Sequence, residues 1–281
     1  MRKRIYSSNA WGYCKLGDSI GLHDIIKRIF DLGFDGFDFL YGVEAYPKIG
    51  SEINLGDIVD LKNIMEEKGG KISSVVLVSF DLSNPEDCVR QLEEGSVLAK
   101  ALDTGNINLL PRKYGITQNE GFKRLEHVWS ARGEEILDMG LVVSAENHIC
   151  FDKADDDIFL IRKTEDFIRL SNLLGGQIRI KFDPAWLLMA SDDPVEAFKK
   201  CLPYTEILDV KDFKDGIFVT PGTGMVQFGE LAQIMSQSNR KLDIAVEVEE
   251  HHFFEPTPME PVIIDMLHKS ALNYYRDVFG E

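Results

Sequence analysis

The chain contains 281 residues, with 31 Lys and Arg against 47 Asp and Glu, and so carries a formal net charge of −16 at pH 7. Hydrophobic residues make up 44% of the sequence, enough to bury a large core, which excludes an intrinsically disordered chain. The acidic balance disfavours binding to nucleic acid or to an anionic membrane, because both attract basic surfaces. The length suits a single barrel-sized domain over residues 1–281.

The compartment is predicted from the cysteines and from what is missing at the start of the chain. The four cysteines are Cys14, Cys88, Cys150 and Cys201. They are far apart and lack metal-ligand spacing, as expected for reduced thiols inside a cell. The basic first residues are not followed by an apolar stretch, and no window approaches the roughly 20 apolar residues of a membrane span. We therefore expect a soluble cytoplasmic protein.

Short apolar runs alternate with longer amphipathic segments along the whole chain. The runs are rich in Val, Ile and Phe, which is typical of strands covered on both faces. The predicted strands are Arg4–Ser8, Asp35–Leu40, Ile72–Val78, Asn106–Leu110, Leu141–Glu146, Gln177–Asp183, Thr205–Val210 and Asp243–Glu249. The predicted helices are Asp24–Leu32, Leu55–Glu67, Pro85–Ala101, Gln118–Met139, Lys163–Leu174, Pro194–Cys201, Phe228–Ser236 and Pro261–Val278.

Strict alternation of strand and helix predicts a parallel sheet, and eight such units are the number that closes a (β/α)₈ TIM barrel. A doubly wound open sheet is the alternative, but no G-x-G-x-x-G follows the first predicted strand. The late cluster Gly222-Thr223-Gly224 also lacks the Lys-Ser/Thr of a phosphate-binding P-loop. We therefore predict a single-domain α/β TIM barrel.

Carboxylates occur at the ends of four consecutive predicted strands, as Glu146, Asp183, Asp209 and Glu247. In a parallel barrel, the reacting groups project from the C-terminal ends of the strands, so these side chains should converge. Clustered carboxylates are costly to bury unless they are paired or bound to a cation. A divalent cation is the simplest group that removes the repulsion, and an all-oxygen ligand set favours Mn²⁺ or Mg²⁺ over Zn²⁺.

An ordered set of short motifs resembles a known family. These motifs are Gly33–Phe39, Glu146-Asn147-His148, Asp183-Pro184, Val210-Lys211-Asp212 and the late Glu247. Together they resemble the xylose-isomerase-like sugar isomerase/epimerase barrels. The resemblance implies a divalent metal held by Glu, Asp, His and Glu from the fifth to the eighth strands.

The resemblance places three of these ligands on Glu146, Asp183 and Glu247. The third position departs from the family pattern, because Asp209 stands where the family has His two residues before Lys-Asp. Either Asp209 is a fourth oxygen ligand, or the site is degenerate and binds metal poorly. We favour the first, because Asp is a competent ligand for hard cations. Glu249 is the alternative to Glu247 if the strand register is shifted.

The same resemblance implies that Glu146 and Glu247 transfer protons. One removes a proton beside a metal-polarised carbonyl, and the other returns it through an enediolate. The predicted function is a divalent-metal-dependent sugar isomerase or epimerase that acts on a ketose, a keto-sugar or a related polyol. The expected partner is a small-molecule carbohydrate, and family members are often homo-oligomers.

Five further residues are candidates for catalysis or substrate binding, and each has a structural alternative. His148 could act as an acid or base, or be a structural hydrogen-bond donor. Lys211 could stabilise an oxyanion, or neutralise neighbouring carboxylates. Trp11 and Trp186 could stack on a sugar ring, or pack in the core. Arg112 could bind a phosphate or carboxylate, or be a solvated charge.

Three other functions compete with the isomerase. A dehydratase or lyase would begin with the same proton removal and differ in its product. A non-catalytic barrel would have a degenerate site, and the substitution at Asp209 is the support for that alternative. A DNA-repair enzyme of the endonuclease IV type needs several zinc ions and many His ligands, which six His and an acidic chain disfavour.

Overall fold

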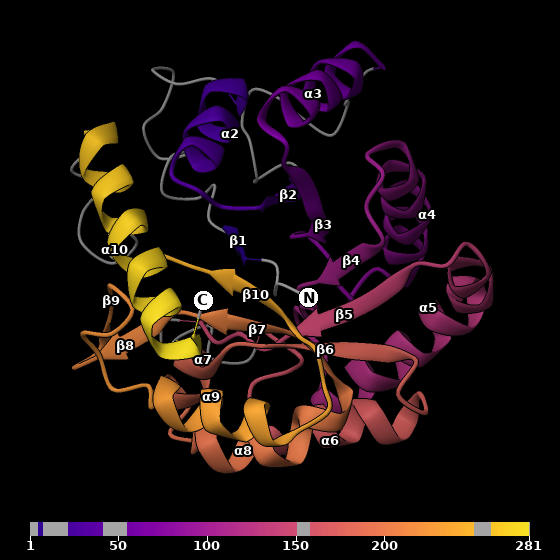
Figure 1. Cartoon of the computed structure of the whole chain (residues 1–281). Helices are drawn as coiled ribbons and strands as arrows, with labels where there is room; N and C mark the ends of the chain where they lie inside the picture. Colours follow the sequence, from indigo (N-terminus) through magenta and orange to yellow (C-terminus); the bar gives the residue numbers. More distant parts are fainter. Residues whose placement is uncertain (1–4, 8–21, 42–54, 151–157, 250–259, 281) are drawn as a thin grey trace.

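A computed structural model describes residues 5–7, 22–41, 55–150, 158–249 and 260–280. Eight parallel strands close into a barrel in the order β1-β10-β7-β6-β5-β4-β3-β2 (Figure 1). The strands are β1 (Ile5–Ser7), β2 (Gly36–Tyr41), β3 (Lys71–Leu77), β4 (Asn106–Leu109), β5 (Val142–Glu146), β6 (Ile178–Phe182), β7 (Thr205–Val210) and β10 (Asp243–Val246). Tyr6 of β1 closes the ring, because it pairs with Gly36 on one side and Ala245 on the other. The predicted TIM barrel is confirmed.

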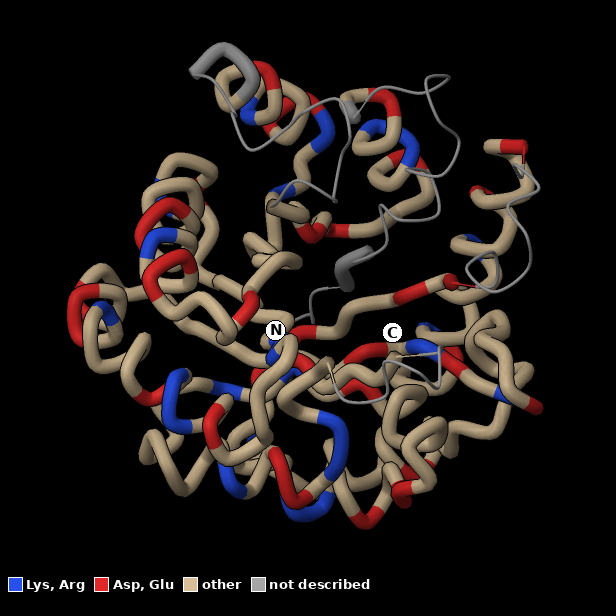
Figure 2. Tube along the Cα trace, turned by 180° about the vertical axis from the view of Figure 1, so that it is seen from behind, with Lys and Arg blue, Asp and Glu red and all other residues tan. Residues whose placement is uncertain are grey.

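Helices surround the strands, and each of the eight predicted helices is present (Figure 1). They are α2 (Leu22–Asp31), α3 (Leu55–Lys68), α4 (Pro85–Ala101), α5 (Gln118–Asp138), α6 (Thr164–Leu173), α8 (Pro194–Cys201), α9 (Phe228–Gln237) and α10 (Pro261–Phe279). Among the described residues, no helix is long and apolar enough to cross a membrane. Acidic and basic residues are interspersed along these outer helices (Figure 2).

Helix starts follow local capping chemistry. The side chain of Asn84 accepts a hydrogen bond from the Asp87 amide at the start of α4, where Pro85 occupies the first turn. At the start of α5, Thr117 accepts one from the Glu120 amide. These bonds satisfy amides that have no partner inside the helix, which is why the starts could be predicted from sequence.

Three short elements were not predicted. A single-turn 3₁₀ helix, η3, covers Leu202–Tyr204, and the short helix α7 covers Pro184–Met189. Strands β8 (Asp212–Lys214) and β9 (Ile217–Val219) form an antiparallel hairpin beyond β7. Its turn residues Asp215 and Gly216 both have positive φ, at 51° and 89°. An Asp-Gly pair is a recognised hairpin signal, so this element was detectable in the sequence.

The core between strands and helices fixes the orientation of the strand residues. In β6, the Phe182 ring lies 6.0 Å from Phe167 of α6 and 5.0 Å from Phe198 of α8, measured between centroids. Burial of each such side chain contributes about 2–3 kcal/mol. Because neighbouring strand residues point to opposite faces, anchoring Phe182 outward directs Lys181 and Asp183 to the other face, toward the barrel interior.

Candidate functional site

Asp183 lies directly after β6, and its two carboxylate oxygens face different parts of the structure. Its Oδ1 accepts hydrogen bonds from the Ala185 and Trp186 amides at 2.8 and 3.2 Å, and so caps α7. Pro184 occupies the first position of that helix, where a missing N–H costs nothing. The backbone of Asp183 is held by Asn147, which exchanges two hydrogen bonds of 2.9 Å with it. Oδ2 is thereby directed away from the helix, toward the barrel axis.

Glu146 ends β5 and is oriented by polar neighbours on both adjoining strands. Its Oε2 accepts hydrogen bonds from Asn108 Nδ2 at 2.9 Å and from Lys181 Nζ at 2.8 Å. The Asn108 amide is itself oriented by Ser144, whose hydroxyl donates to Asn108 Oδ1 at 3.2 Å. This chain of donors fixes the carboxylate in one position.

Asp209 lies in β7, and its carboxylate is fully buried without a hydrogen bond from any described residue. The nearest cation is Lys181, with Nζ 3.5 Å from Asp209 Oδ2. Burial raises the pKa of Asp209 well above its ordinary value, against the lowering effect of Lys181. A buried carboxylate without hydrogen-bond donors is unfavourable, so the site is built to accept a further cation or a proton here.

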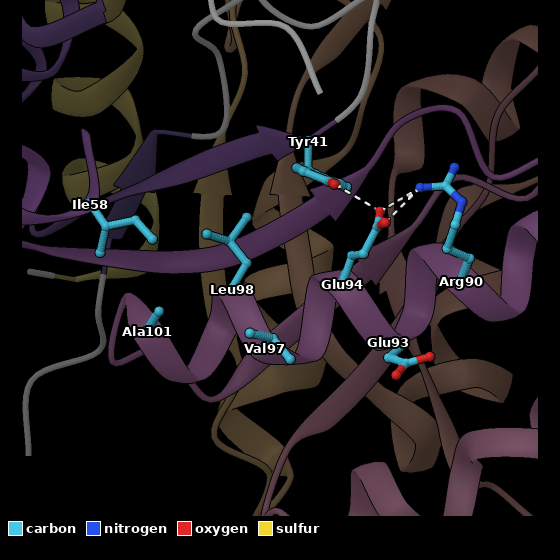
Figure 3. Close-up of a pocket in the computed structure, with 8 residues that line it drawn as sticks. All are labelled: Tyr41, Ile58, Arg90, Glu93, Glu94, Val97, Leu98 and Ala101. Carbon is cyan, nitrogen blue, oxygen red and sulfur yellow. Dashed lines mark hydrogen bonds and ion pairs between the residues drawn. The ribbon is translucent and has the colours of Figure 1, made fainter. Parts of the chain in front are cut away.

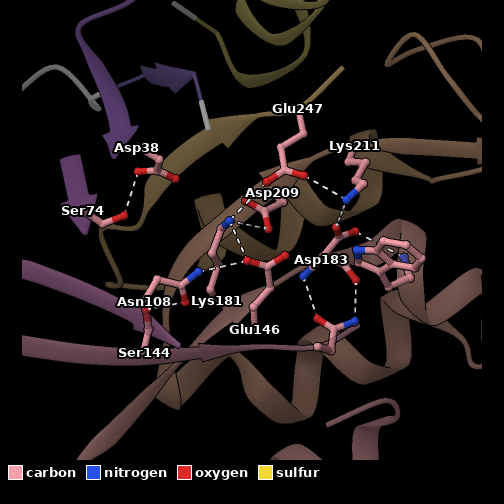
Figure 4. Close-up of polar contacts among 12 residues, drawn as sticks. Asp38, Ser74, Asn108, Ser144, Glu146, Lys181, Asp183, Asp209, Lys211 and Glu247 are labelled. Atoms are coloured by element: carbon pink, nitrogen blue, oxygen red, sulfur yellow. Dashed lines mark hydrogen bonds and ion pairs between the residues drawn. The ribbon is translucent and has the colours of Figure 1, made fainter. Parts of the chain in front are cut away.

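Three of the four predicted ligands converge, because Glu146, Asp183 and Asp209 each offer an oxygen within 4.8 Å of the others. Figure 4 shows these side chains meeting at the C-terminal ends of β5, β6 and β7. The fourth, Glu247, follows β10, and each of its oxygens contacts an ammonium group. Oε1 lies 3.2 Å from Lys181 Nζ, and Oε2 lies 2.9 Å from Lys211 Nζ.

Two buried lysines supply positive charge among these carboxylates. Lys181 reaches Glu146, Asp209 and Glu247, and its side chain is 3% exposed. Lys211 Nζ lies 3.0 Å from Asp183 Oδ2 and 3.0 Å from Glu249 Oε2, and the side chain is 2% exposed. The chain itself therefore supplies part of the positive charge that a metal was expected to provide, and Lys211 contacts carboxylates as its structural alternative describes.

The two lysines are outnumbered by the carboxyl groups around them. This imbalance bears on whether the residues could bind a metal. The cluster comprises six carboxyl groups against the two lysines: Asp38, Glu146, Asp183, Asp209, Glu247 and Glu249. Burial raises the pKa of Asp183 to about 7, although Lys211 opposes the shift. A divalent cation would add positive charge here, and oxygen donors suit a hard ion. The carboxylates of Glu146, Asp183 and Asp209 could therefore hold a metal ion.

Two of the six carboxyl groups, Glu249 and Asp38, lie outside the four predicted ligands. Glu249, the alternative ligand, pairs with Lys211 and has its pKa raised by burial to about 7. Asp38 of β2 accepts hydrogen bonds through Oδ1 from the hydroxyls of Ser73 and Ser74, while its Oδ2 accepts none from the described part of the chain. Burial raises the pKa of Asp38 as well.

His148 is placed against aromatic rings. Its imidazole lies 3.7 Å from Trp186 and 4.1 Å from Phe159, measured between centroids, and Nδ1 is 2.8 Å from the Ile149 carbonyl oxygen. Burial, and next the charge of Lys211, lowers its pKa well below 6.5, so the ring is neutral at pH 7. With a proton on Nδ1 donated to Ile149, Nε2 is left as an acceptor.

Three residues were predicted to stack on a sugar or to bind an anion: Trp186, Arg112 and Trp11. Trp186 is 1% exposed, with Lys211 Nζ 4.6 Å from its ring. Arg112 follows β4 and lies over Phe159 at 5.6 Å. Trp11 lies outside the described residues. Roles in substrate binding for these three remain predictions.

Sequence reasoning did not find the role of Asp212. Its carboxylate accepts hydrogen bonds from the backbone amides of Phe213, Gly222, Gly224 and Val226, at 2.8–3.0 Å. A Cβ on Gly224 would lie 2.2 Å from Asp212 Oδ1, so glycine is required for this approach. The Lys-Asp pair and the late glycine cluster were both noted in the sequence, but nothing there connects them. Asp212 therefore anchors the loop rather than joining the cluster.

A separate groove of about 520 Å³ lies between α3 and α4, outside the carboxylate cluster (Figure 3). Glu94 on its wall accepts hydrogen bonds from Tyr41 at 2.9 Å and from Arg90 at 2.7 Å. Burial and the neighbouring Glu94 raise the pKa of Tyr41 to about 12. Both acidic side chains that line this groove are ion-paired with arginines, Glu94 with Arg90 and Glu93 with Arg132.

Comparison with known proteins matches this architecture to one family. The sequence profile of the xylose isomerase-like TIM barrel family matches residues 26–269. The chain belongs to this family. No protein of curated function matches the sequence.

Solved structures share the same barrel at low sequence identity. A D-psicose 3-epimerase crystallised in the presence of D-fructose is 13% identical over 99% of this chain and 100% of that chain, with a TM-score of 0.78. The 3-keto-D-glucoside 4-epimerase YcjR from E. coli is 13% identical over 98% and 100%, with a TM-score of 0.72. The probable 3-DHS dehydratase AsbF from Bacillus anthracis is 15% identical over 97% and 98%, with a TM-score of 0.70. These likenesses show the fold.

Proposed function

We propose that this protein is a divalent-metal-dependent isomerase or epimerase of a ketose, a keto-sugar or a related polyol. The observation that carries the proposal is the convergence of Glu146, Asp183 and Asp209 within 4.8 Å at the barrel end where such barrels do their chemistry. The names of the structural neighbours D-psicose 3-epimerase and 3-keto-D-glucoside 4-epimerase support the substrate class.

Glu146, Asp183 and Asp209 would hold the metal, with Glu247 as a fourth ligand once one of its oxygens leaves a lysine. Mn²⁺ or Mg²⁺ suits these oxygen donors better than Zn²⁺. A divalent cation held there would polarise the substrate carbonyl and make the neighbouring C–H more acidic.

Glu146 and Glu247 are the proposed proton-transfer groups. Both contact the same ammonium, Lys181 Nζ, at 2.8 and 3.2 Å, so they approach the cluster from two sides. One carboxylate removes a proton from the substrate carbon, and the other returns it to the opposite face or to the adjacent carbon. Lys211 is proposed to keep Glu247 ionised and to stabilise negative charge that develops on a substrate oxygen.

His148 and the aromatic residues around it are proposed to position the sugar. A neutral imidazole with Nε2 as acceptor suits a hydrogen bond from a substrate hydroxyl. The Trp186 ring packs against the His148 imidazole. Trp11 is proposed to stack on the apolar face of the sugar. Arg112 is proposed to bind a phosphate or carboxylate if the substrate carries one.

A dehydratase is the second candidate, because the barrel is also similar to the probable dehydratase AsbF. Both reactions begin with proton removal beside a carbonyl. Analysis of products by mass separates them, since a dehydratase product is lighter by one water and an isomerase product is not.

The test combines metal analysis with isotope exchange. The protein is purified without chelator, its metal content is measured, and D-psicose and related ketoses are incubated with it in D₂O. We expect deuterium incorporation that Glu146→Gln and Glu247→Gln each reduce by about 10²–10⁴-fold. Glu230→Gln, an exposed position on α9, is the matched control and should exchange at the wild-type rate. Unchanged exchange in both site variants would overturn the proton-transfer assignment.

A further inference from the structure

The ammonium group of Lys181 lies among the carboxylates that would also attract a metal cation. Its Nζ lies 2.8 Å from Glu146 Oε2, 3.2 Å from Glu247 Oε1 and 3.5 Å from Asp209 Oδ2. Three of the four predicted metal ligands therefore share one ammonium group, as Figure 4 shows. Two of these three, Glu146 and Asp209, also belong to the group of carboxylates that converge within 4.8 Å.

The fold leaves this ammonium little freedom to move away. Lys181 is the fourth of the five residues of β6, between Ile180 and Phe182, which are both fully buried. The side chain of Lys181 is only 3% exposed. An ammonium buried among carboxylates is held there by charge, because an unpaired buried cation is strongly unfavourable.

Lys211 differs from Lys181 in its partners. It contacts Asp183, Glu247 and Glu249, and its Nζ also lies over the Trp186 and Phe218 rings at 4.6 and 4.8 Å. Only Asp183 among the three converging carboxylates is its partner. Lys211 thus contacts one of the three converging carboxylates, while Lys181 contacts two of them.

We propose that Lys181 is an internal cation that competes with the divalent metal for Glu146 and Asp209 and so lowers the metal affinity of the site. This inference rests on the proposed function. Two like charges at such short range repel in a buried site, where screening by water is weak. The ammonium also fixes Glu146 and Glu247 in the metal-free protein, so the ligands are held in place before a metal arrives. The consequence is a site that binds a metal more weakly than the same carboxylates would without Lys181.

The experiment measures Mn²⁺ affinity without any turnover, by calorimetric titration and by electron paramagnetic resonance of free Mn²⁺. The proteins are wild type, Lys181→Met, Lys181→Gln and Lys181→Arg, with Arg179→Met as matched control from the opposite end of the same strand. We expect Lys181→Met and Lys181→Gln to bind Mn²⁺ roughly tenfold or more tightly than wild type. Lys181→Arg should not gain affinity, and Arg179→Met should bind as wild type does. Lys181→Gln retains a hydrogen-bond donor, and so tests the charge if the Met variant does not fold.

The outcomes separate this inference from the proposed function. Equal or weaker binding by the neutral variants, with wild type binding Mn²⁺, would overturn the role of Lys181 and leave the metal site standing. Binding by the neutral variants alone would support the role of Lys181 and overturn metal dependence in the native protein. Absence of binding in every variant would overturn both.

Discussion

A charged cluster at one end of the barrel differs from the cluster at the other end in its burial and in its numbers of acidic and basic groups. At the N-terminal ends of the strands, Arg179 and Arg240 lie on either side of Glu206, at 3.8 and 3.6 Å. Each arginine also donates to a backbone carbonyl, of Pro203 or of Thr205. At the C-terminal ends, two lysines face six carboxyl groups, and Asp209 accepts no hydrogen bond from the residues that the structure describes.

The difference is that the arginines at the N-terminal ends pair with Glu206 and with backbone carbonyls, whereas at the C-terminal ends the carboxyl groups outnumber the lysines. The N-terminal cluster is partly exposed, and its two arginines offer more hydrogen-bond donors than Glu206 can accept. This cluster therefore needs no bound ligand to be stable. The C-terminal cluster is buried, and its carboxyl groups outnumber its lysines. In TIM barrels, catalytic residues lie at the C-terminal end and stabilising residues at the other, which fits this contrast. The following substitutions test it, from the largest expected effect to the smallest.

Replacing Lys211 should have the largest effect on stability. Lys211→Met leaves Asp183, Glu247 and Glu249 without their shared cation, and breaking a buried ion pair from one side costs about 3–5 kcal/mol. Urea unfolding of the metal-free protein measures the loss, with exposed Lys200→Met as control. The double variant Lys211→Met, Glu249→Gln should recover part of the stability, and a double variant as unstable as the single one would show that charge is not the cause.

Replacing Asp212 should have the next largest effect, and it should be confined to one loop. Asp212→Asn presents an amide where four backbone N–H groups converge, and loss of hydrogen bonds to a charged acceptor costs about 2–3 kcal/mol. Hydrogen exchange of the amides of Gly222, Gly224 and Val226 should accelerate. Asp215→Asn at the exposed hairpin turn is the control, and equal acceleration there would contradict the anchoring role.

Replacing Asp209 should move stability and metal binding in opposite directions. Asp209→Asn removes a buried charge that lacks hydrogen bonds, so the free energy of unfolding without metal should stay constant or rise by about 1 kcal/mol. Affinity for Mn²⁺ should fall roughly tenfold or more, because ligand charge is lost. Thermal melts with and without Mn²⁺ measure both. A variant that is destabilised and still binds Mn²⁺ normally would place Asp209 with the structural carboxylates.

Replacing Glu206 at the opposite end should have the smallest effect. Glu206→Gln keeps an acceptor for Arg179 and Arg240, and partly exposed ion pairs contribute only about 0–1 kcal/mol. Neither Mn²⁺ affinity nor deuterium exchange into a ketose should change. A loss of Mn²⁺ binding in this variant would contradict the difference between the two ends of the barrel.

Much of the fold was predictable because its signal is local. Alternating apolar runs and amphipathic segments predicted eight strands and eight helices, and the capping residue Asn84 marks the start of α4. The eighth strand ends at Val246 rather than at Glu249, which places both late glutamates beyond the regular sheet. The single-turn helix η3 has no repeating pattern from which to predict it.

The site was predictable only in part, for a physical reason. Glu146, Asp183 and Asp209 lie at the C-terminal ends of consecutive strands, so parallel pairing alone brings them together. Lys181 finds its partners on β5, β7 and the end of β10, and that choice depends on how the barrel closes and how far a flexible side chain extends. The contact between Asp212 and Gly224 depends likewise on the path of a loop.

The two oxygens of Asp183 have separate partners, and this links the charged cluster to the barrel wall beside it. Oδ1 holds the first turn of α7, which carries Trp186 and, stacked on it, His148. Oδ2 lies 3.0 Å from Lys211 Nζ, inside the cluster. One carboxylate therefore serves both the start of a helix and the ion pairs of the barrel mouth, so a substitution of Asp183 would disturb the two together.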